Sequence, residues 1–215
     1  LFEKGIQRPV ALQTRATVAA ILRAGAPVGR DVVLGQLIDD ARHGVARVLC
    51  GPLGIGRHTL ARQIGRRLQL RGHPVESWPA SEAFPSSATL SKALVRLLGD
   101  DGGFAEIGTR LVEAESRVEG LDPAAIEREI AASVRSVLER LLVLPHADAR
   151  PVLLVERYES APWPVRCLVR GLVDASEDGR PLPFGMVVVA EEHAGVAGLA
   201  VAPLTRDDIA LLLEQ

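Results

Sequence analysis

The chain has few aromatic side chains, two cysteines and very little lysine. Phe, Trp and Tyr make up 3% of the 215 residues, so the core has to be built from Leu, Val, Ile and Ala. Cys50 and Cys167 stand in apolar stretches, which favours buried thiols in a reducing compartment over a disulfide framework. We therefore expect a cytoplasmic protein. Lys4 and Lys92 are the only lysines, so nearly all the positive charge is arginine.

The chain also lacks a charge excess of either sign and a long apolar run. Lys and Arg number 25 against 27 Asp and Glu, for a net charge of -2. Domains that wrap nucleic acid usually carry a strong positive excess, so we expect no direct contact with nucleic acid. No run reaches the roughly 18 apolar residues of a membrane-spanning helix, so no membrane partner is expected. Cys and His residues do not occur at the spacings of a metal site. The composition, with 47% hydrophobic and 24% charged residues, is typical of a globular protein.

The pattern along the chain divides it into three parts. Residues 1–26 predict a short helical arm, residues 27–204 one α/β domain, and residues 205–215 the start of a further helix. The chain begins at Leu1 rather than Met and ends at Gln215 inside a helical pattern. We therefore expect it to be a piece of a longer protein.

Strands alternate with helices in the predicted domain, which is typical of βαβ units and a parallel sheet. Apolar runs of four to six residues predict buried strands, whereas apolar positions spaced three or four apart predict helices. The runs that predict strands are 45–50, 75–78, 151–155, 186–190 and 199–201. Helical patterns cover 88–98, 104–118 and 123–142, the segments after Arg30 and Gly56, and the segment after Pro164.

A glycine-rich segment follows the first strand and opens a helix. Gly51, Gly54 and Gly56 have the spacing of the G-x-x-x-x-G part of a Walker A motif. Glycines let the backbone turn sharply and bring its N–H groups around an anion, and the helix N-terminus adds partial positive charge. This context predicts a phosphate-binding loop. The alternative is a glycine-rich turn without a ligand.

The residues that follow the glycines depart from the Walker A pattern. The motif has Lys and then Ser or Thr, where this chain has Arg57 and His58. A guanidinium is planar and bulkier than an ammonium, and imidazole is a poor substitute for the hydroxyl that binds Mg²⁺. Thr59 has the right group one residue late, about 100° further round the helix.

Val28-Gly29-Arg30-Asp31, the helix after it and the glycine loop together resemble the start of STAND-type ATPase modules, which are AAA-like P-loop proteins. The resemblance is to the ATPase modules of large LuxR-type transcriptional regulators, and it spans about residues 27–213. It implies a three-layer P-loop NTPase fold that binds ATP or ADP with Mg²⁺. The residues it assigns to the nucleotide are Val28, Gly29, Arg30, Gly51, Gly54, Gly56, Arg57, His58 and Thr59.

The later motifs resemble the family in position but not in chemistry. The strand 151–155 resembles the Walker B strand, which normally ends in two acids, and here it is followed by Glu156 and Arg157. Glu156 is a remnant that could hold a metal, whereas a cation at Arg157 cannot activate water. The strand 186–190 resembles the family's sensor strand, and Glu191 and Glu192 follow it where the family usually has an arginine. The alternative is an ordinary strand end with charges that face solvent.

These departures predict a degenerate ATPase. We expect a regulatory module of a larger, transcription-related protein, acting through protein contacts, self-association or ligand sensing with little or no hydrolysis. The alternatives are a working ATPase that uses Arg57 and Glu156, and a structural subunit of an AAA-type assembly. We also expect Arg57 or Arg157 to fill the place of the missing cations and to pair with Glu156 or Glu191. The other arginines of the helix after the loop are interpreted as a solvated face.

Overall fold

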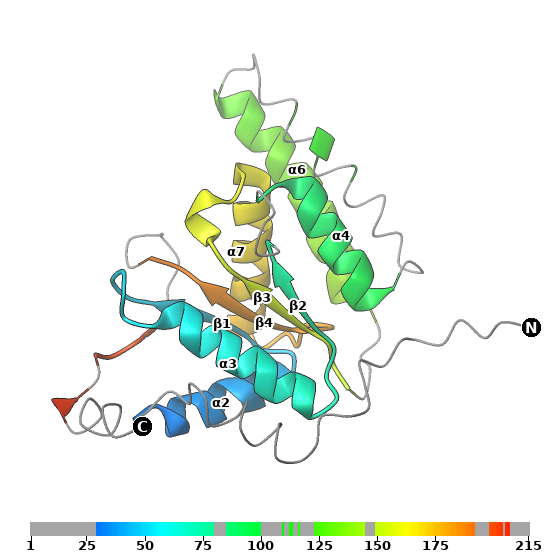
Figure 1. The fold of residues 1–215 in the computed structure, drawn as a ribbon. Helices are drawn as coiled ribbons and strands as arrows, with labels where there is room; N and C mark the ends of the chain where they lie inside the picture. The colour runs from blue at the N-terminus through cyan, green and yellow to red at the C-terminus, as the bar shows by residue number, and fades with distance from the viewer. Residues whose placement is uncertain are drawn as a thin grey trace, which may run out of the picture.

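The computed structural model describes residues 29–79, 85–99, 109, 112–113, 116, 123–144, 149–191, 198–203 and 205–206. Helices and strands alternate along this part of the chain (Figure 1). In chain order, the elements are α2 (Asp31–Arg42), β1 (Ala46–Cys50), α3 (Arg57–Leu70), β2 (Val75–Trp78), α4 (Ser87–Leu98), α6 (Pro123–Leu142), β3 (Val152–Val155), the 3₁₀ helix η1 (Tyr158–Ser160), α7 (Trp163–Glu177), β4 (Gly185–Val189) and β5 (Leu199–Ala200).

The strands that the structure describes form one parallel sheet of five. Their order is β2-β3-β4-β1-β5, so β1 and β4 lie side by side although most of the chain separates them. In the register of this pair Ala46 lies opposite Met186 and Leu49 opposite Val189. β3 and β4 are buried at every position and β1 at all but one, as expected of strands covered on both faces.

Helices cover both faces of the sheet and make a three-layer α/β fold. α2 and α3 pack on one face, and α4, α6 and α7 lie on the other (Figure 1). Successive residues of β3 alternate between the two cores, with Leu153 and Val155 facing α4 and α7 and Leu154 facing α3. The α/β class and the parallel sheet are therefore confirmed.

The connections change direction and face together. From β1 the chain crosses over α3 to β2 at the sheet edge, and it returns through β3 and β4 over helices on the opposite face. Two connections that run in opposite directions along the sheet and cross opposite faces have the same handedness. This is the arrangement that right-handed βαβ units require. The chain therefore departs from β1 on one face and comes back beside it on the other.

Trp78 and the start of α4 are joined by a polar contact inside the core. The side chain of Ser86 accepts from the Thr89 N–H and that of Thr89 accepts from the Ser86 N–H, which makes a capping box. The buried Trp78 indole donates from Nε1 to Thr89 Oγ1 at 2.9 Å. This cap fixes where α4 begins on the sheet, and the sequence patterns did not predict it.

Most predicted boundaries agree with the structure to within one or two residues, and α7 begins at Trp163 where the sequence predicted a helix after Pro164. The predicted arm 1–26 lies outside the described residues, as do most of 104–118 and all of 207–215. Cys50 is buried and Cys167 is half-buried, and the two do not form a disulfide bond. Among the helices of the described ranges, none is both long enough and apolar enough to cross a membrane.

Candidate functional site

The glycine loop lies where the parallel strands end. It connects the carboxyl end of β1 to α3, beside the carboxyl ends of β3 and β4. Ligands of open parallel sheets bind outside the carboxyl ends of the strands, at the point where the strand order reverses. The connections of this sheet reverse direction between β1 and β4. The loop is therefore at the position in the fold where a ligand site is expected.

The three glycines of the loop have backbone conformations that side chains disfavour. Their φ angles are 153° at Gly51, 85° at Gly54 and 92° at Gly56. A Cβ at Gly51 would also lie 3.1 Å from the Ile55 side chain. Gly56 is the N-cap of α3 in the left-handed conformation, and no side chain among the described residues caps this helix end. The first turn of α3 therefore keeps the backbone N–H groups that an anion can accept from.

Arg57, which stands where the resembled motif has lysine, is buried. Its side chain passes Gly51, where a Cβ would lie 3.9 Å from the Arg57 Cδ. The guanidinium Nη1 donates to the carbonyl oxygen of Ala190, the residue after β4. Arg57 is 4% exposed, so its positive charge lies between the loop and the sheet. The expected pairing of Arg57 with Glu156 or Glu191 is wrong, because its bond goes to this backbone carbonyl.

Glu156 follows β3 and is held by two side chains of α3. Arg62 Nη2 donates to Glu156 Oε2 at 3.2 Å, and His58 Nδ1 lies 3.2 Å from the same oxygen. The Glu156 side chain is 12% exposed, whereas those of His58 and Arg62 are 43% and 60% exposed. The carboxylate is therefore covered by these two side chains, and the solvent-facing strand end considered from the sequence does not describe it. We call these three residues the Glu156 cluster.

Arg30 joins the glycine loop to the segment that follows β5. Its Nη2 donates to the carbonyl oxygens of Ile55, at 2.8 Å, and Ala202, at 2.9 Å. Gly29, in the turn before α2, is exposed, and Val28 lies outside the described residues. The structure thus brings Arg30 to the loop, as the resemblance implies, but uses its guanidinium to bind two backbone carbonyls.

The remaining predicted residues lie at the rim of this edge. Thr59 is exposed on α3. Arg157 is exposed and has φ 57° and ψ 43°, a left-handed conformation that is uncommon outside glycine. The backbone N–H of Glu191 donates to the Glu159 carboxylate, and the sequence patterns did not predict a role for Glu159 here. Glu192 and His193 lie outside the described residues.

Sequence reasoning also missed the role of Arg62, which was assigned to a solvated face. His58 and Arg62 are four residues apart on one helix, so they share a face. Two polar side chains at this spacing, on the helix that the glycine loop opens, could have predicted the cluster with Glu156, the residue that follows β3. Arg67, further along α3, reaches Asp31 at 3.5 Å instead.

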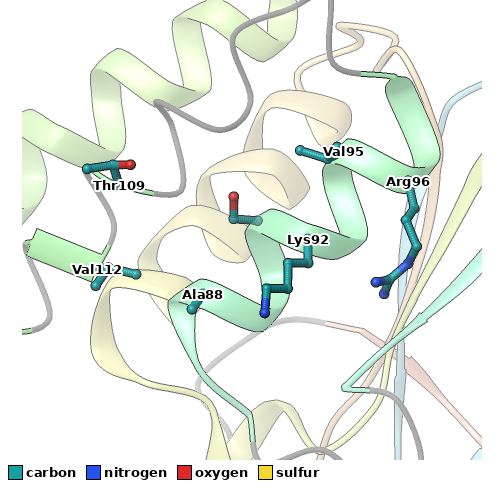
Figure 2. A pocket seen from close by; sticks show the side chains of 7 residues that line it. Ala88, Lys92, Val95, Arg96, Thr109 and Val112 are labelled. Carbon is teal, nitrogen blue, oxygen red and sulfur yellow. The ribbon is translucent and has the colours of Figure 1, made fainter.

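A separate hollow of about 530 Å³ lies away from the strand ends, along α4. Figure 2 shows Lys92, Val95 and Arg96 on α4, with Thr109 and Val112 across from them. Arg96 Nε already donates to Glu76 Oε1 at 2.7 Å, which offsets part of the positive charge at this rim. Most neighbours of Thr109 and Val112 lie outside the described residues, so no ligand is assigned to this hollow.

The strand ends combine a helix N-terminus that no described side chain caps with a carboxylate that is already hydrogen-bonded. The described residues include no group of three or more His, Cys, Asp or Glu side chains that could hold a metal ion. The carboxylate of Glu156 is engaged, and Arg157 cannot take a proton from water. Comparison with protein-family models gives no match, and comparison with curated proteins gives none either.

Proposed function

We propose that this chain is a regulatory module on a P-loop-like frame, which hydrolyses ATP slowly or not at all. It acts through protein contacts or ligand sensing within a larger, transcription-related protein of the cytoplasm, as the resemblance of its motifs implies. The support is the combination of a parallel sheet, a glycine loop at the reversal point and an altered set of charged side chains around it. The frame of an ATPase is kept while the groups that act on ATP are changed.

The observation that carries this proposal is the engagement of Glu156 by His58 and Arg62. Glu156 Oε2 already accepts from two donors at the position where the resemblance places a metal-binding acid, and Arg157 stands where it places the acid that activates water. Removal of a positioned general base typically lowers a rate by about 10²–10⁴. With Arg57 also bound to a backbone carbonyl, the described site has no free group in the position of either the base or the phosphate-binding lysine.

The loop itself fits a phosphate group better than the cluster fits a metal. The open N-terminus of α3 and the positive φ angles of the loop favour an anion, and Arg57 and Arg30 add positive charge nearby. We therefore propose ATP or ADP as the ligand class, sensed rather than consumed. The residues proposed to contact it are the loop glycines, His58 and the first turn of α3.

The net charge of -2 leaves no basic footprint for nucleic acid on this chain. We propose that any DNA binding by the larger protein belongs to other parts of it. Its partners would then be neighbouring domains of the same protein, a second copy, or another protein. Sequence and geometry name no particular partner.

Phosphate release from ATP tests the proposal. We expect the wild type with Mg²⁺ to release phosphate no faster than Glu156→Gln, because the carboxylate does no chemistry. The matched control is Glu177→Gln, which makes the same change at an exposed glutamate of α7 outside the Glu156 cluster. Release that needs Mg²⁺, survives in Glu177→Gln and is lost in Glu156→Gln would show a working ATPase. Calorimetric titration with ATP and ADP, run in parallel, measures whether the loop still binds nucleotide.

A further inference from the structure

Glu156 stands where the resemblance places a metal-binding acid, and this position allows the fit of Mg²⁺ to be tested on the structure. Mg²⁺ demands oxygen ligands in near-octahedral geometry and is usually held by one or two carboxylates together with phosphate oxygens. In the resembled motif the protein also supplies a hydroxyl after the loop. This chain has imidazole at that position, in His58.

The two side chains approach the same atom of the carboxylate. Arg62 Nη2 and His58 Nδ1 each lie 3.2 Å from Glu156 Oε2. Because a carboxylate oxygen accepts hydrogen bonds, both nitrogens carry their proton in this contact. One oxygen therefore receives two donors, and a divalent ion bound there would lie against a guanidinium. Repulsion of this kind weakens metal binding most strongly where water is largely excluded, and the Glu156 side chain is 12% exposed.

The placement of the cluster explains why it is more than a pair on the surface. Glu156 follows the buried strand β3, and its backbone N–H donates to the Trp78 carbonyl at 2.7 Å, which fixes it beside the end of β2. His58 and Arg62 come from successive turns of α3, the helix that the glycine loop opens. A half-exposed pair alone is worth little, whereas two donors on one covered carboxylate neutralise a charge that would otherwise be poorly solvated.

We infer that His58 and Arg62 take the place of the metal ion at this site. The Glu156 cluster is an internal substitute for Mg²⁺, and any polyphosphate that the loop takes up is bound without a divalent cation. The inference rests on the proposed function, since it concerns the ligand preference of the same loop. It goes further by naming the two side chains that exclude the metal.

Binding of Mn²⁺, a spectroscopic stand-in for Mg²⁺, tests the inference. Free Mn²⁺ is measured by electron paramagnetic resonance during titration of the protein, with and without ADP. We expect the wild type to show no stoichiometric binding up to about 1 mM Mn²⁺. In His58→Thr/Arg62→Ala, which supplies a hydroxyl after the loop and removes both donors to Glu156, Mn²⁺ should bind at least about tenfold more tightly in the presence of ADP, and Glu156→Gln added to this variant should abolish the gain.

Arg66→Ala is the matched control, because it removes an exposed arginine of the same helix without touching the cluster. Circular dichroism of each variant checks that the fold is kept. Stoichiometric Mn²⁺ binding by the wild type that is lost in Glu156→Gln would overturn the inference, and so would a folded double variant that binds Mn²⁺ no better than Arg66→Ala. Phosphate release separates the two proposals: metal binding without release overturns only the inference, and release overturns the proposed function.

Discussion

Arg57 at the start of α3 donates a hydrogen bond to the carbonyl oxygen of Ala190, the residue that follows β4. The two residues are 133 positions apart, and their contact joins the glycine loop to the strand beside β1. A lysine in a phosphate-binding loop directs its charge at the ligand. Here the cation is turned to the protein itself, so it stabilises the loop in the absence of any ligand.

Replacement of Arg57 by alanine should therefore destabilise the fold. The change leaves the Ala190 carbonyl without this donor and opens space beneath the loop, so we expect a loss of about 2 kcal/mol in the free energy of unfolding, or roughly 4–8 °C in Tm. Differential scanning calorimetry measures the shift. Arg66→Ala, on the exposed face of the same helix, should change Tm by less than about 2 °C. Equal Tm values for the two variants would contradict the structural role of Arg57.

Arg30 should affect the loop more than the whole fold. Its guanidinium binds the carbonyls of Ile55 and Ala202, which lie in two segments at the rim of the sheet. In Arg30→Ala we expect faster amide hydrogen exchange at residues 53–56 and 201–203, with little change in the sheet, because local openings cost less than global unfolding. Mass spectrometry of exchanged peptides measures this. Arg42→Ala, at the opposite end of α2, should leave both segments unchanged, and uniform acceleration in every peptide would argue against a local link.

How much of this could be read from the sequence depends on the range of the interaction. The runs 45–50, 151–155 and 186–190 predicted β1, β3 and β4, because a strand buried on both faces has to be apolar throughout. The glycines of the loop were also predictable, since positive φ angles leave a mark in residue type. These signals are local, and each is carried by the residues that form the element.

The contacts that define the site have no such local mark. The partner of Arg57 is a backbone carbonyl, which every residue possesses, so no side-chain pattern could have named Ala190. His58 and Glu156 are 98 residues apart, and their approach depends on the order of strands in the sheet. Sequence patterns predict a parallel sheet but do not order five strands, so the charges were recognised and their pairing was not.

Tyr158 should make the fold sensitive to alkaline pH. Burial raises the pKa of the Tyr158 phenol above 10.0, although Arg166 and Arg170 nearby act to lower it. Because the folded state holds this proton more tightly than the unfolded state, its stabilising contribution is complete below pH 10 and is lost as the pH rises through the folded pKa. We expect the free energy of unfolding to fall above about pH 10, and Tyr158→Phe to reduce that fall.

Two measurements check this prediction. Urea unfolding at a series of alkaline pH values gives the slope for the wild type and for Tyr158→Phe. Tyr158 is the single tyrosine of the chain, so the near-ultraviolet absorbance of tyrosinate reports the titration of this residue alone. The Tyr158 hydroxyl lies 3.5 Å from the Arg166 carbonyl, so its removal should have little effect at neutral pH. A titration midpoint at or below that of the urea-unfolded chain would contradict the prediction.

Three glycines in different surroundings should respond to alanine in a graded way. A Cβ at Gly185, in β4, would lie 2.1 Å from the backbone oxygen of Ala41 in α2, and a backbone cannot rotate away. At Gly65 in α3 the obstacle is the Leu154 Cδ1, 2.7 Å away, at the movable end of a side chain. At Gly35 in α2 nothing lies within 4 Å.

We therefore expect Gly185→Ala to destabilise the fold by about 3 kcal/mol or more, because α2 has to move away from the sheet. Gly65→Ala should cost about 1 kcal/mol. Gly35→Ala should stabilise the fold by about 0.5–1 kcal/mol, since it lowers the entropy of the unfolded chain and raises helix propensity. Urea unfolding of the three variants measures the series. The order of the three changes is the decisive result. If Gly35→Ala destabilised the fold as much as Gly185→Ala, α2 would not pack on β4 through Gly185 as described. The position of Arg30, which directly precedes α2, would then be wrong as well.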